Sequence, residues 1–200
     1  MSGLTKPYVF IAEATALDFL NTRPFAAERL ENGADLLAWL EAAELVPRPV
    51  LARMRKTVRR DELNAVAARA RALRSWFREF VVEFKGANAP ADALGRLGPL
   101  NDLLSRDEAF EEIVARDDGG LDLEVSRRWR SPESLLFPIG QAMAALICEG
   151  DLPNVKACEG AECVLLFVDR SRGRGRRWCS MTNCGNRAKQ AAYRSRRPRD

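Results

Sequence analysis

Apolar residues recur with a helical period along much of the first 150 residues of the chain. The clearest stretch spans about Asp61 to Lys85, where apolar side chains three and four positions apart form one continuous stripe. We expect this stripe to lie in a core, with a coiled-coil dimer seam as the alternative. The stripe contains Leu63, Val66, Ala70, Leu73, Phe77, Phe80 and Phe84. Four arginines lie off the stripe and are expected on a solvated face: Arg69, Arg71, Arg74 and Arg78.

Shorter patterns predict the other elements of the N-terminal part. Short helices are expected within ALDFLNTR before Pro24, over Asp35–Ala43 and over Pro49–Thr57, and a weaker helical stretch reaches about Ser105. Residues 8–11 have the composition of a short strand.

A hairpin and one more helix follow. Residues 109–115 and 121–129 alternate apolar and polar side chains around the turn sequence DDGG, which indicates a hairpin. Ser131 then caps a helix that begins with Pro132 and runs to Glu149. Within this helix Cys148 follows an apolar run, and we interpret it as a buried small hydrophobic residue, with a reactive thiol as the alternative.

Composition excludes several classes of protein. The chain has no histidine, which removes Ser-His and Cys-His nucleophiles and His-containing metal sites. No apolar run approaches the roughly 18 residues of a membrane span, and the first residues do not resemble a secretion signal. We therefore expect a cytoplasmic protein without membrane contact, whose five cysteines stay reduced.

Charge distinguishes the last quarter of the chain. Residues 153–200 hold 12 Lys and Arg against 4 Asp and Glu, a net charge of +8, whereas residues 1–152 carry a net charge of −4. Such an asymmetry is typical of proteins that present a terminal module to a polyanion.

Four cysteines in the basic part have the spacing of a metal site. Two pairs, each with four intervening residues, are separated by fifteen residues, so a hairpin can bring two loops together around one ion. We expect structural Zn²⁺ bound by four thiolates; an iron–sulfur cluster and four unrelated cysteines are the alternatives. Gly160 and Gly185 are expected to give the loops a permissive backbone. The predicted ligands are Cys158, Cys163, Cys179 and Cys184.

The sequence after the second pair predicts a basic helix. Asn186 is a suitable N-cap, and Pro198 should end the helix at Arg197. The small side chains of Ala188, Ala191, Ala192 and Ser195 share one narrow face, which we expect to press on the zinc loops. The rest of the helix and the loop before it supply the candidate nucleic-acid contacts Arg187, Lys189, Gln190, Arg194, Arg196, Arg197, Arg174 and Arg176.

The predicted fold class is therefore mainly α with small β-hairpins (α+β). A helical domain over residues 1–152 would serve ligand sensing or dimerisation. A small zinc-finger module with four cysteine ligands, over residues 153–200, would end in a helix. Bound zinc would supply much of the folding free energy of so small a module.

The two parts of the chain resemble known families. The segment LFVDRSRGRGRRWCSMTNCGNRAKQAAYRSRR, together with the upstream cysteines, resembles the CGNR zinc finger, which has the tetrad Cys184-Gly185-Asn186-Arg187. ALDFLNTR and DLLAWLEAAELV resemble the ABATE domain that precedes this finger in bacterial proteins. The resemblance implies a stress-induced transcription regulator with a mostly helical N-terminal region, four cysteine ligands, and Arg187 with the basic helix on the nucleic-acid side.

Our preferred hypothesis is a zinc-dependent DNA-binding regulator, with an unidentified small-molecule effector or homodimerisation at the N-terminal domain. The first alternative is an RNA-binding protein with the same module, because arginine does not distinguish the phosphates of the two polymers. A basic solubilising tail and a redox role of the thiolates are further alternatives. An enzyme would use the polar residues Asp18, Asn21, Thr22 and Arg23, for which capping and internal hydrogen bonds are the simpler explanation.

Overall fold

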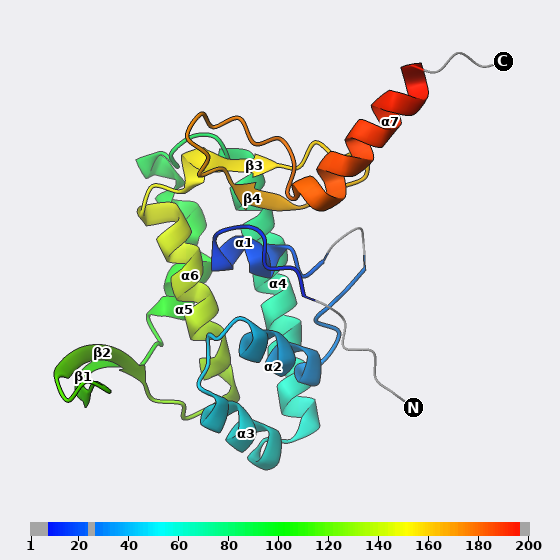
Figure 1. Ribbon diagram of the computed structural model, residues 1–200. Helices are drawn as coiled ribbons and strands as arrows, with labels where there is room; N and C mark the ends of the chain where they lie inside the picture. The colour runs from blue at the N-terminus through cyan, green and yellow to red at the C-terminus, as the bar shows by residue number, and fades with distance from the viewer. Residues whose placement is uncertain (1–7, 24–26, 197–200) are drawn as a thin grey trace.

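A computed structural model describes residues 8–23 and 27–196 of the 200-residue chain. The chain is mostly helical and carries two small antiparallel sheets, which confirms the predicted fold class (Figure 1). The predicted helix stop at Pro24 lies outside the described residues. The α-helices are α1 (Thr15–Leu20), α2 (Gly33–Ala42), α3 (Arg48–Thr57), α4 (Arg60–Phe84), α5 (Gly98–Leu104), α6 (Phe137–Cys148) and α7 (Asn186–Arg196). Shorter helical segments are η2 (Ala91–Leu97), η3 (Pro132–Leu136), η4 (Leu152–Asn154) and the π-helical η5 (Met181–Gly185).

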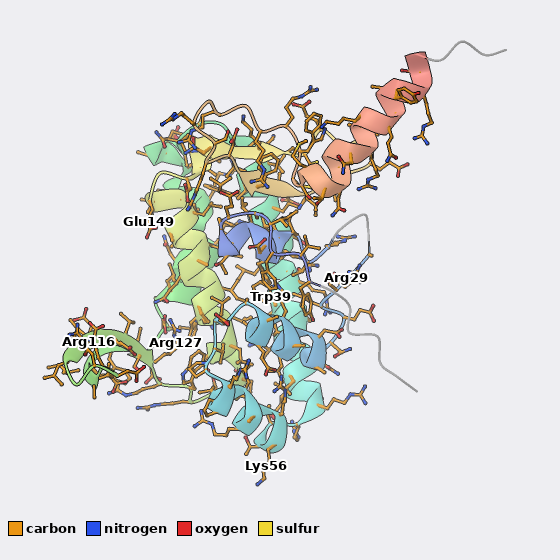
Figure 2. All side chains as sticks on the ribbon, viewed as in Figure 1. Arg29, Trp39, Lys56, Arg116, Arg127 and Glu149 are labelled. Atoms are coloured by element: carbon orange, nitrogen blue, oxygen red, sulfur yellow. The ribbon has the colours of Figure 1, made fainter. Side chains whose placement is uncertain are left out.

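Helix α4 runs through the body, and α1, α2 and η3 pack on it (Figure 1). Most of its predicted apolar stripe lies in the core: Val66, Ala70 and Phe77 are fully or almost fully buried, whereas Leu73 and Phe84 are half-buried. Trp39 lies on α2 in the interior of the body (Figure 2), and the centroid of its ring is 5.2 Å from that of Phe19 on α1. No α-helix of the described segments combines the length and apolar character needed to cross a membrane.

The arginines of α4 do not all lie on a solvated face as predicted. Arg74 is only 3% exposed, and Arg78 is half-buried. Arg74 reaches the interior because it pairs there with Glu28, a partner 46 residues away that helical periodicity cannot reveal. Arg69 keeps the expected exposed position and pairs with Glu133.

The predicted hairpin is present as β1 (Ala109–Ala115) and β2 (Leu121–Arg127), with Gly119 in the turn at φ +83°. At the base of the hairpin, the nearly buried side chains of Arg127 and Asp107 form an ion pair, with Nε and Oδ1 2.6 Å apart. The hairpin extends from the body (Figure 1). Its large apolar side chains Ile113, Leu121, Leu123 and Val125 are exposed.

Three local predictions are wrong. Residues 8–11 form no strand, although the neighbouring Ala12 accepts a backbone hydrogen bond from Val168. The helix expected after Ser131 begins as the 3-10 segment η3 before α6 continues it. Cys148 is exposed and not buried, because it occupies the last helical position of α6 and faces away from the core.

The second sheet joins the cysteine-bearing part to the body. Strands β3 (Val155–Ala157) and β4 (Leu166–Val168) pair antiparallel, and every residue of β4 is buried. Figure 1 shows this sheet lying over α1, with α7 projecting beyond it. The two parts share one hydrophobic core, and their division at residue 152 stays a prediction.

Candidate metal centre and adjoining basic helix

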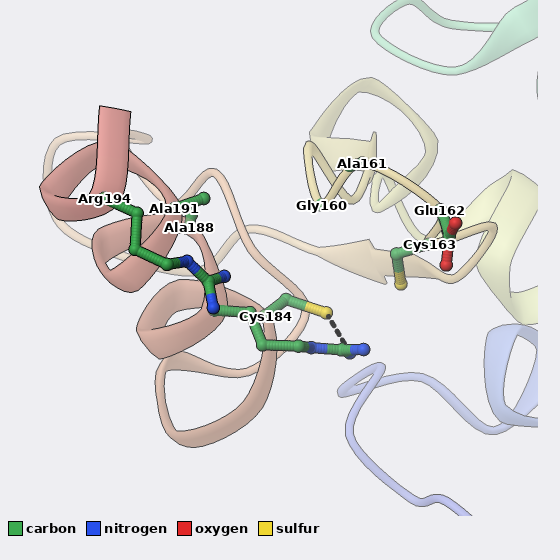
Figure 3. A pocket seen from close by; sticks show the side chains of 9 residues that line it. Gly160, Ala161, Glu162, Cys163, Cys184, Ala188, Ala191 and Arg194 are labelled. Carbon is green, nitrogen blue, oxygen red and sulfur yellow. Dashed lines mark hydrogen bonds between the residues drawn. The ribbon is translucent and has the colours of Figure 1, made fainter. Parts of the chain in front are cut away.

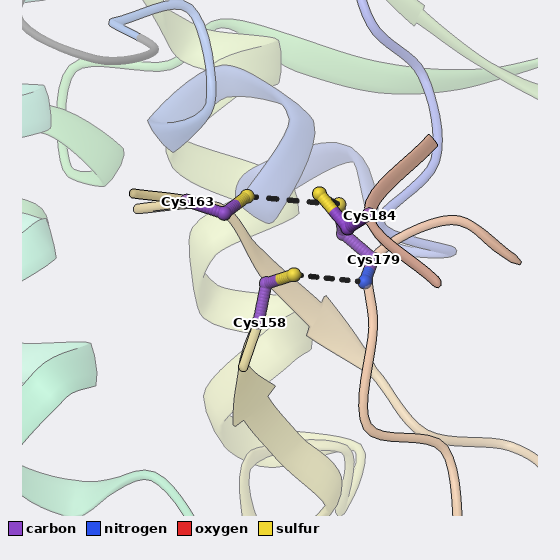
Figure 4. A group of neighbouring side chains, drawn as sticks. All are labelled: Cys158, Cys163, Cys179 and Cys184. Carbon is purple, nitrogen blue, oxygen red and sulfur yellow. Dashed lines mark hydrogen bonds between the residues drawn. The ribbon is translucent and has the colours of Figure 1, made fainter. Parts of the chain in front are cut away.

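The structure brings four cysteine sulfurs to one point. Cys158 begins the loop between β3 and β4, and Cys163 lies three residues before β4. Cys179 and Cys184 lie before and within η5 (Figure 4). The four sulfur atoms lie within 4.8 Å of one another, and all four thiols are free. The sequence-predicted ligands are thus close enough together to bind one ion.

The sulfur spacing suits a tetrahedral zinc ion. Zn–S bonds of roughly 2.3 Å in a tetrahedron place the sulfurs about 3.8 Å apart. The Sγ atom of Cys179 lies 3.7 Å from that of Cys163 and 3.6 Å from that of Cys184. These distances are far longer than the roughly 2.05 Å of a disulfide. The cluster therefore fits structural Zn²⁺ and no disulfide.

Backbone amides support the anionic form of one sulfur. The amides of Gly160 and Cys179 donate to the sulfur of Cys158 at 3.4 and 3.3 Å. Burial acts to raise the pKa of Cys158, but these hydrogen bonds outweigh it and the pKa is lowered. Burial raises the pKa of Cys163 to about 11 and raises that of Cys179 further. Metal binding by these two thiols at neutral pH therefore releases protons.

The two glycines of the cysteine loops serve close packing rather than left-handed backbone. Neither has a positive φ, which corrects the expected reason for their presence. A Cβ on Gly160 would lie 3.2 Å from the Cβ of Cys163 and 3.3 Å from the sulfur of Cys184. A Cβ on Gly185 would lie 2.9 Å from the sulfur of Met181, on the same helical turn, and 3.5 Å from the ring of Trp178. Glycine at position 160 therefore lets the first cysteine loop approach the second, and glycine at position 185 leaves room for the Met181 side chain.

The basic helix starts directly from the metal cluster. Ser180 accepts a hydrogen bond from the amide of Asn183 and caps the π-helical turn η5, which contains Cys184 and continues into α7. Asn186 is not the cap that the sequence predicts, because the helical backbone begins five residues earlier; its side chain donates to the carbonyl of Thr182. π-Helical turns inside helices are frequent at functional sites.

One arginine of the helix turns back toward the cluster. The Nη2 atom of Arg187 donates to the sulfur of Cys184 at 3.3 Å, as the dashed line in Figure 3 shows. A guanidinium at this distance offsets part of the negative charge of four thiolates. Arg187 therefore contacts the cysteine cluster directly.

Beyond its first turn, α7 is exposed on every side. The side chains of Lys189, Gln190 and Arg194 reach solvent, as predicted for the outer face. The small face does not press on the zinc loops along its length: Ala188 is half-buried, but Ala191 is exposed. A cleft of about 230 Å³ separates α7 from the first cysteine loop (Figure 3). Arg196 ends the helix, and Arg197 lies outside the described residues.

The two predicted contacts in the preceding loop both bond to the protein's own backbone; Arg176 is half-buried and Arg174 is exposed. Arg176 donates to the backbone carbonyl of Cys179 at 2.6 Å, pairs with Glu13, and lies over the ring of Phe167 at 4.4 Å. Arg174 donates to the backbone carbonyl of Asp169. These contacts give both arginines a role in holding the module, and their contact with nucleic acid stays a prediction.

Sequence reasoning missed the buried carboxylate that organises this loop. Asp169 is fully buried and accepts hydrogen bonds from Lys156, Ser171 and the amide of Arg176. Burial acts to raise the pKa of Asp169, but these donors outweigh it and lower the pKa. An acidic residue within a strongly basic segment was the signal that could have identified it.

Two protein families match the chain. Residues 154–197 match the CGNR zinc finger, and residues 13–150 match the ABATE family, described as "Putative stress-induced transcription regulator". A comparison with curated proteins finds none that matches the chain. Because the ABATE match covers more than half of its residues, the chain belongs to this transcription-regulator family and carries a CGNR zinc finger with a four-cysteine cluster suited to structural Zn²⁺.

Proposed function

We propose that this chain is a zinc-dependent DNA-binding transcription regulator whose metal site fixes the start of a basic helix that contacts nucleic acid. The position of α7 supports this proposal most: the helix starts at the cysteine cluster, projects from the body and exposes cationic side chains (Figure 1). The family match supports nucleic-acid binding in general.

In this proposal the zinc is structural. The ligands are the thiolates of Cys158, Cys163, Cys179 and Cys184, which together complete a tetrahedral site without a position for water. When bound, the ion supplies a cross-link between the β3–β4 loop and η5. An isolated helix of eleven residues is marginal in water, so a fixed first turn is what allows α7 to persist.

The proposed nucleic-acid face lies along α7. Its eleven residues extend about 16 Å, a length that the major groove of DNA accommodates. Lys189 and Arg194 would contact phosphates, and Gln190 or Arg194 could also reach base edges. The N-terminal part, residues 1–152, would regulate this contact by effector binding or dimerisation.

We infer that the chain is a binding protein and not an enzyme. The carboxylate of Asp18 accepts hydrogen bonds from the backbone amides of Ile11 and Ala12. The side-chain amide of Asn21 makes two hydrogen bonds to the backbone of Leu166. The hydroxyl of Thr22 donates a hydrogen bond to the carbonyl of Phe19 and accepts one from the guanidinium of Arg74. These hydrogen bonds support a structural role for Asp18, Asn21 and Thr22. Free thiols at the cluster also fit the reducing cytoplasm.

Salt-dependent DNA binding tests the proposal. The zinc-loaded full chain should bind duplex DNA in an anisotropy titration, with an affinity that falls as salt rises. The double variant Lys189→Ala/Arg194→Ala should bind more weakly, and its salt slope should decrease by roughly 0.9 for each lost phosphate contact.

The matched control is Lys56→Ala/Arg60→Ala, which removes the same charge from exposed positions on α3 and α4. Figure 2 places Lys56 at the end of the body away from α7. Equal affinity and equal salt slope in wild type and the α7 variant would refute the proposed face. Competition between duplex DNA and RNA at one salt concentration decides which polymer the face prefers.

A further inference from the structure

A second cationic site lies at the junction between the body and the cysteine module. A cleft of about 280 Å³ opens where the end of α1, the middle of α4 and the loop before β4 meet. It is lined by Leu20, Arg23, Arg74, Ser75, Arg78 and Val164. Three of these six side chains are arginines, and none of the six is acidic.

One of the three positive charges is compensated inside the protein. The guanidinium of Arg74 donates two hydrogen bonds to the carboxylate of Glu28, at 2.9 and 2.5 Å, and a third to the hydroxyl of Thr22 at 2.7 Å. Because Arg74 is almost fully buried and both of its terminal nitrogens, Nη1 and Nη2, are hydrogen-bonded, its position in the cleft wall is fixed. A bidentate arginine–carboxylate pair is among the strongest polar contacts in proteins.

The other two charges have no carboxylate partner within the described residues. Among the described residues, Arg23 makes no hydrogen bond or ion pair, and Arg78 donates only to the backbone carbonyl of Val164. Burial lowers the pKa of Arg78, and repulsion from Arg74 and Arg23 lowers it further. Two uncompensated guanidinium groups thus face one partly enclosed space, an arrangement that an anion would stabilise.

We propose that this cleft binds a small anionic molecule, through either a phosphate group or a carboxylate group held by Arg23 and Arg78. Guanidinium groups match such oxygens with paired, charge-assisted hydrogen bonds. The volume is close to the lower end of small-molecule pockets, about 300–1,000 Å³, and therefore selects a compact ligand. Leu20 adds an apolar contact, whereas the hydroxyl of Ser75 already donates to the backbone carbonyl of Arg71 at 3.0 Å.

One side chain of the cleft, Arg78, also contacts the first cysteine loop. Val164 directly follows Cys163, and its carbonyl oxygen is the acceptor of Arg78. A bound anion competes with that carbonyl for the guanidinium and so changes the support of the first cysteine loop. By linkage, anion binding and DNA binding then alter each other's affinity. This second step rests on the proposed DNA-binding function, whereas binding of the anion does not.

Calorimetry on the zinc-loaded full chain tests the first step. Inorganic phosphate and succinate, each titrated at constant ionic strength set with chloride, separate a phosphate from a carboxylate ligand. At least one should bind saturably with one site per chain. Arg23→Gln and Arg78→Gln should each raise its Kd about tenfold or more, the effect of losing one hydrogen bond between charged groups. Arg60→Gln, an exposed cation elsewhere on α4, should leave the Kd unchanged.

A variant that binds the anion more tightly than wild type shows that a raised Kd in the arginine variants is not simply the result of misfolding. Glu28→Gln leaves Arg74 uncompensated and should lower the Kd, whereas Lys189→Ala/Arg194→Ala should not change it. Circular dichroism verifies that each variant is folded. If Arg78→Gln unfolds, Arg23→Gln carries the test, because Arg23 supports no described contact. Absence of saturable binding, or equal Kd values for wild type, Arg23→Gln and Arg60→Gln, overturns the anion site.

DNA affinity with and without the bound anion tests the second step. We expect saturating anion to shift the DNA Kd at least fivefold in wild type and not in Arg23→Gln. Anion binding with an unchanged DNA Kd overturns the coupling and leaves the site supported. If the chain binds no DNA at all, the proposed function fails, and the calorimetric Kd values alone decide the anion site.

Discussion

The side-chain amide of Asn21 makes two hydrogen bonds to the backbone of Leu166. Its Nδ2 donates to the carbonyl oxygen at 2.8 Å, and its Oδ1 accepts from the amide nitrogen at 3.0 Å. The two residues are separated by 145 positions, and both are buried. Asn21 thereby acts toward β4 as a neighbouring strand would, and it attaches the strand that follows Cys163 to helix α1.

Replacing Asn21 should destabilise the junction. Asn21→Ala leaves a buried N–H and a buried C=O without partners, each at a cost of about 1–3 kcal/mol. We expect the free energy of unfolding in urea to fall by about 2–4 kcal/mol. Asn101→Ala, at an exposed position of α5, should change it little. A loss for Asn21→Ala no larger than that of the control would contradict the structural role of this amide.

Zinc content should depend on the clustered cysteines and not on Cys148. Elemental analysis of purified protein should find one zinc per chain in wild type and in Cys148→Ser, because Cys148 lies exposed at the end of α6. Cys179→Ser, at a buried sulfur of the cluster, should lose most of the metal. A strong chelator should remove the helical signal of α7 from wild type while the body stays folded. Full zinc retention in Cys179→Ser would rule out this ligand set.

Local sequence patterns were sufficient for much of this fold. The apolar stripe of α4, the DDGG turn between β1 and β2, and the two cysteine pairs are each encoded within a short window, where period and spacing have direct geometric meaning. The spacing of the cysteines also predicted correctly that the four sulfurs meet at one point.

Long-range pairing was not accessible to the same reasoning. Nothing near Arg74 in the sequence shows that Glu28 will accompany it into the interior, and nothing near Asn21 points to Leu166. The pattern around Cys148 likewise indicates an apolar helix face but not which helix position faces the core. Such features depend on tertiary contacts that one sequence does not reveal.

The ion pair of Glu28 and Arg74 should make stability depend on pH. Burial acts to raise the pKa of Glu28, but the bonds from Arg74 and from the amides of Leu30 and Arg29 outweigh it and lower the pKa. The folded state therefore releases this proton more readily than the unfolded chain does. The stabilisation is fully present above the unfolded carboxyl pKa of about 4.3 and is lost as pH falls through the lower folded value.

Glu28→Gln isolates this effect. At pH 7 it should reduce the free energy of unfolding by about 2–3 kcal/mol, somewhat less than for a fully buried pair because the Glu28 side chain keeps 26% exposure. Below about pH 4 the difference from wild type should shrink, because the wild-type carboxyl is then protonated as well. Comparing the two proteins at each pH cancels the proton-linked loss of zinc. Glu83→Gln, in an exposed pair with Arg96, should show a much smaller difference, and an equal one would refute the argument.

Close packing at Gly160 should control how tightly the cluster holds zinc. An added methyl group would meet Cys163 and the sulfur of Cys184 at distances shorter than ordinary van der Waals contact, so the first loop must move away from η5. Gly160→Ala should therefore weaken zinc binding about tenfold in competition with a metal indicator, the size of effect typical for residues that support metal ligands. Gly173→Ala, in the same module but with open space around the added atom, should bind zinc as wild type does. If both variants match wild type, the approach of the two loops has no part in metal affinity, and the tetrahedron must be set by the cysteine spacing alone.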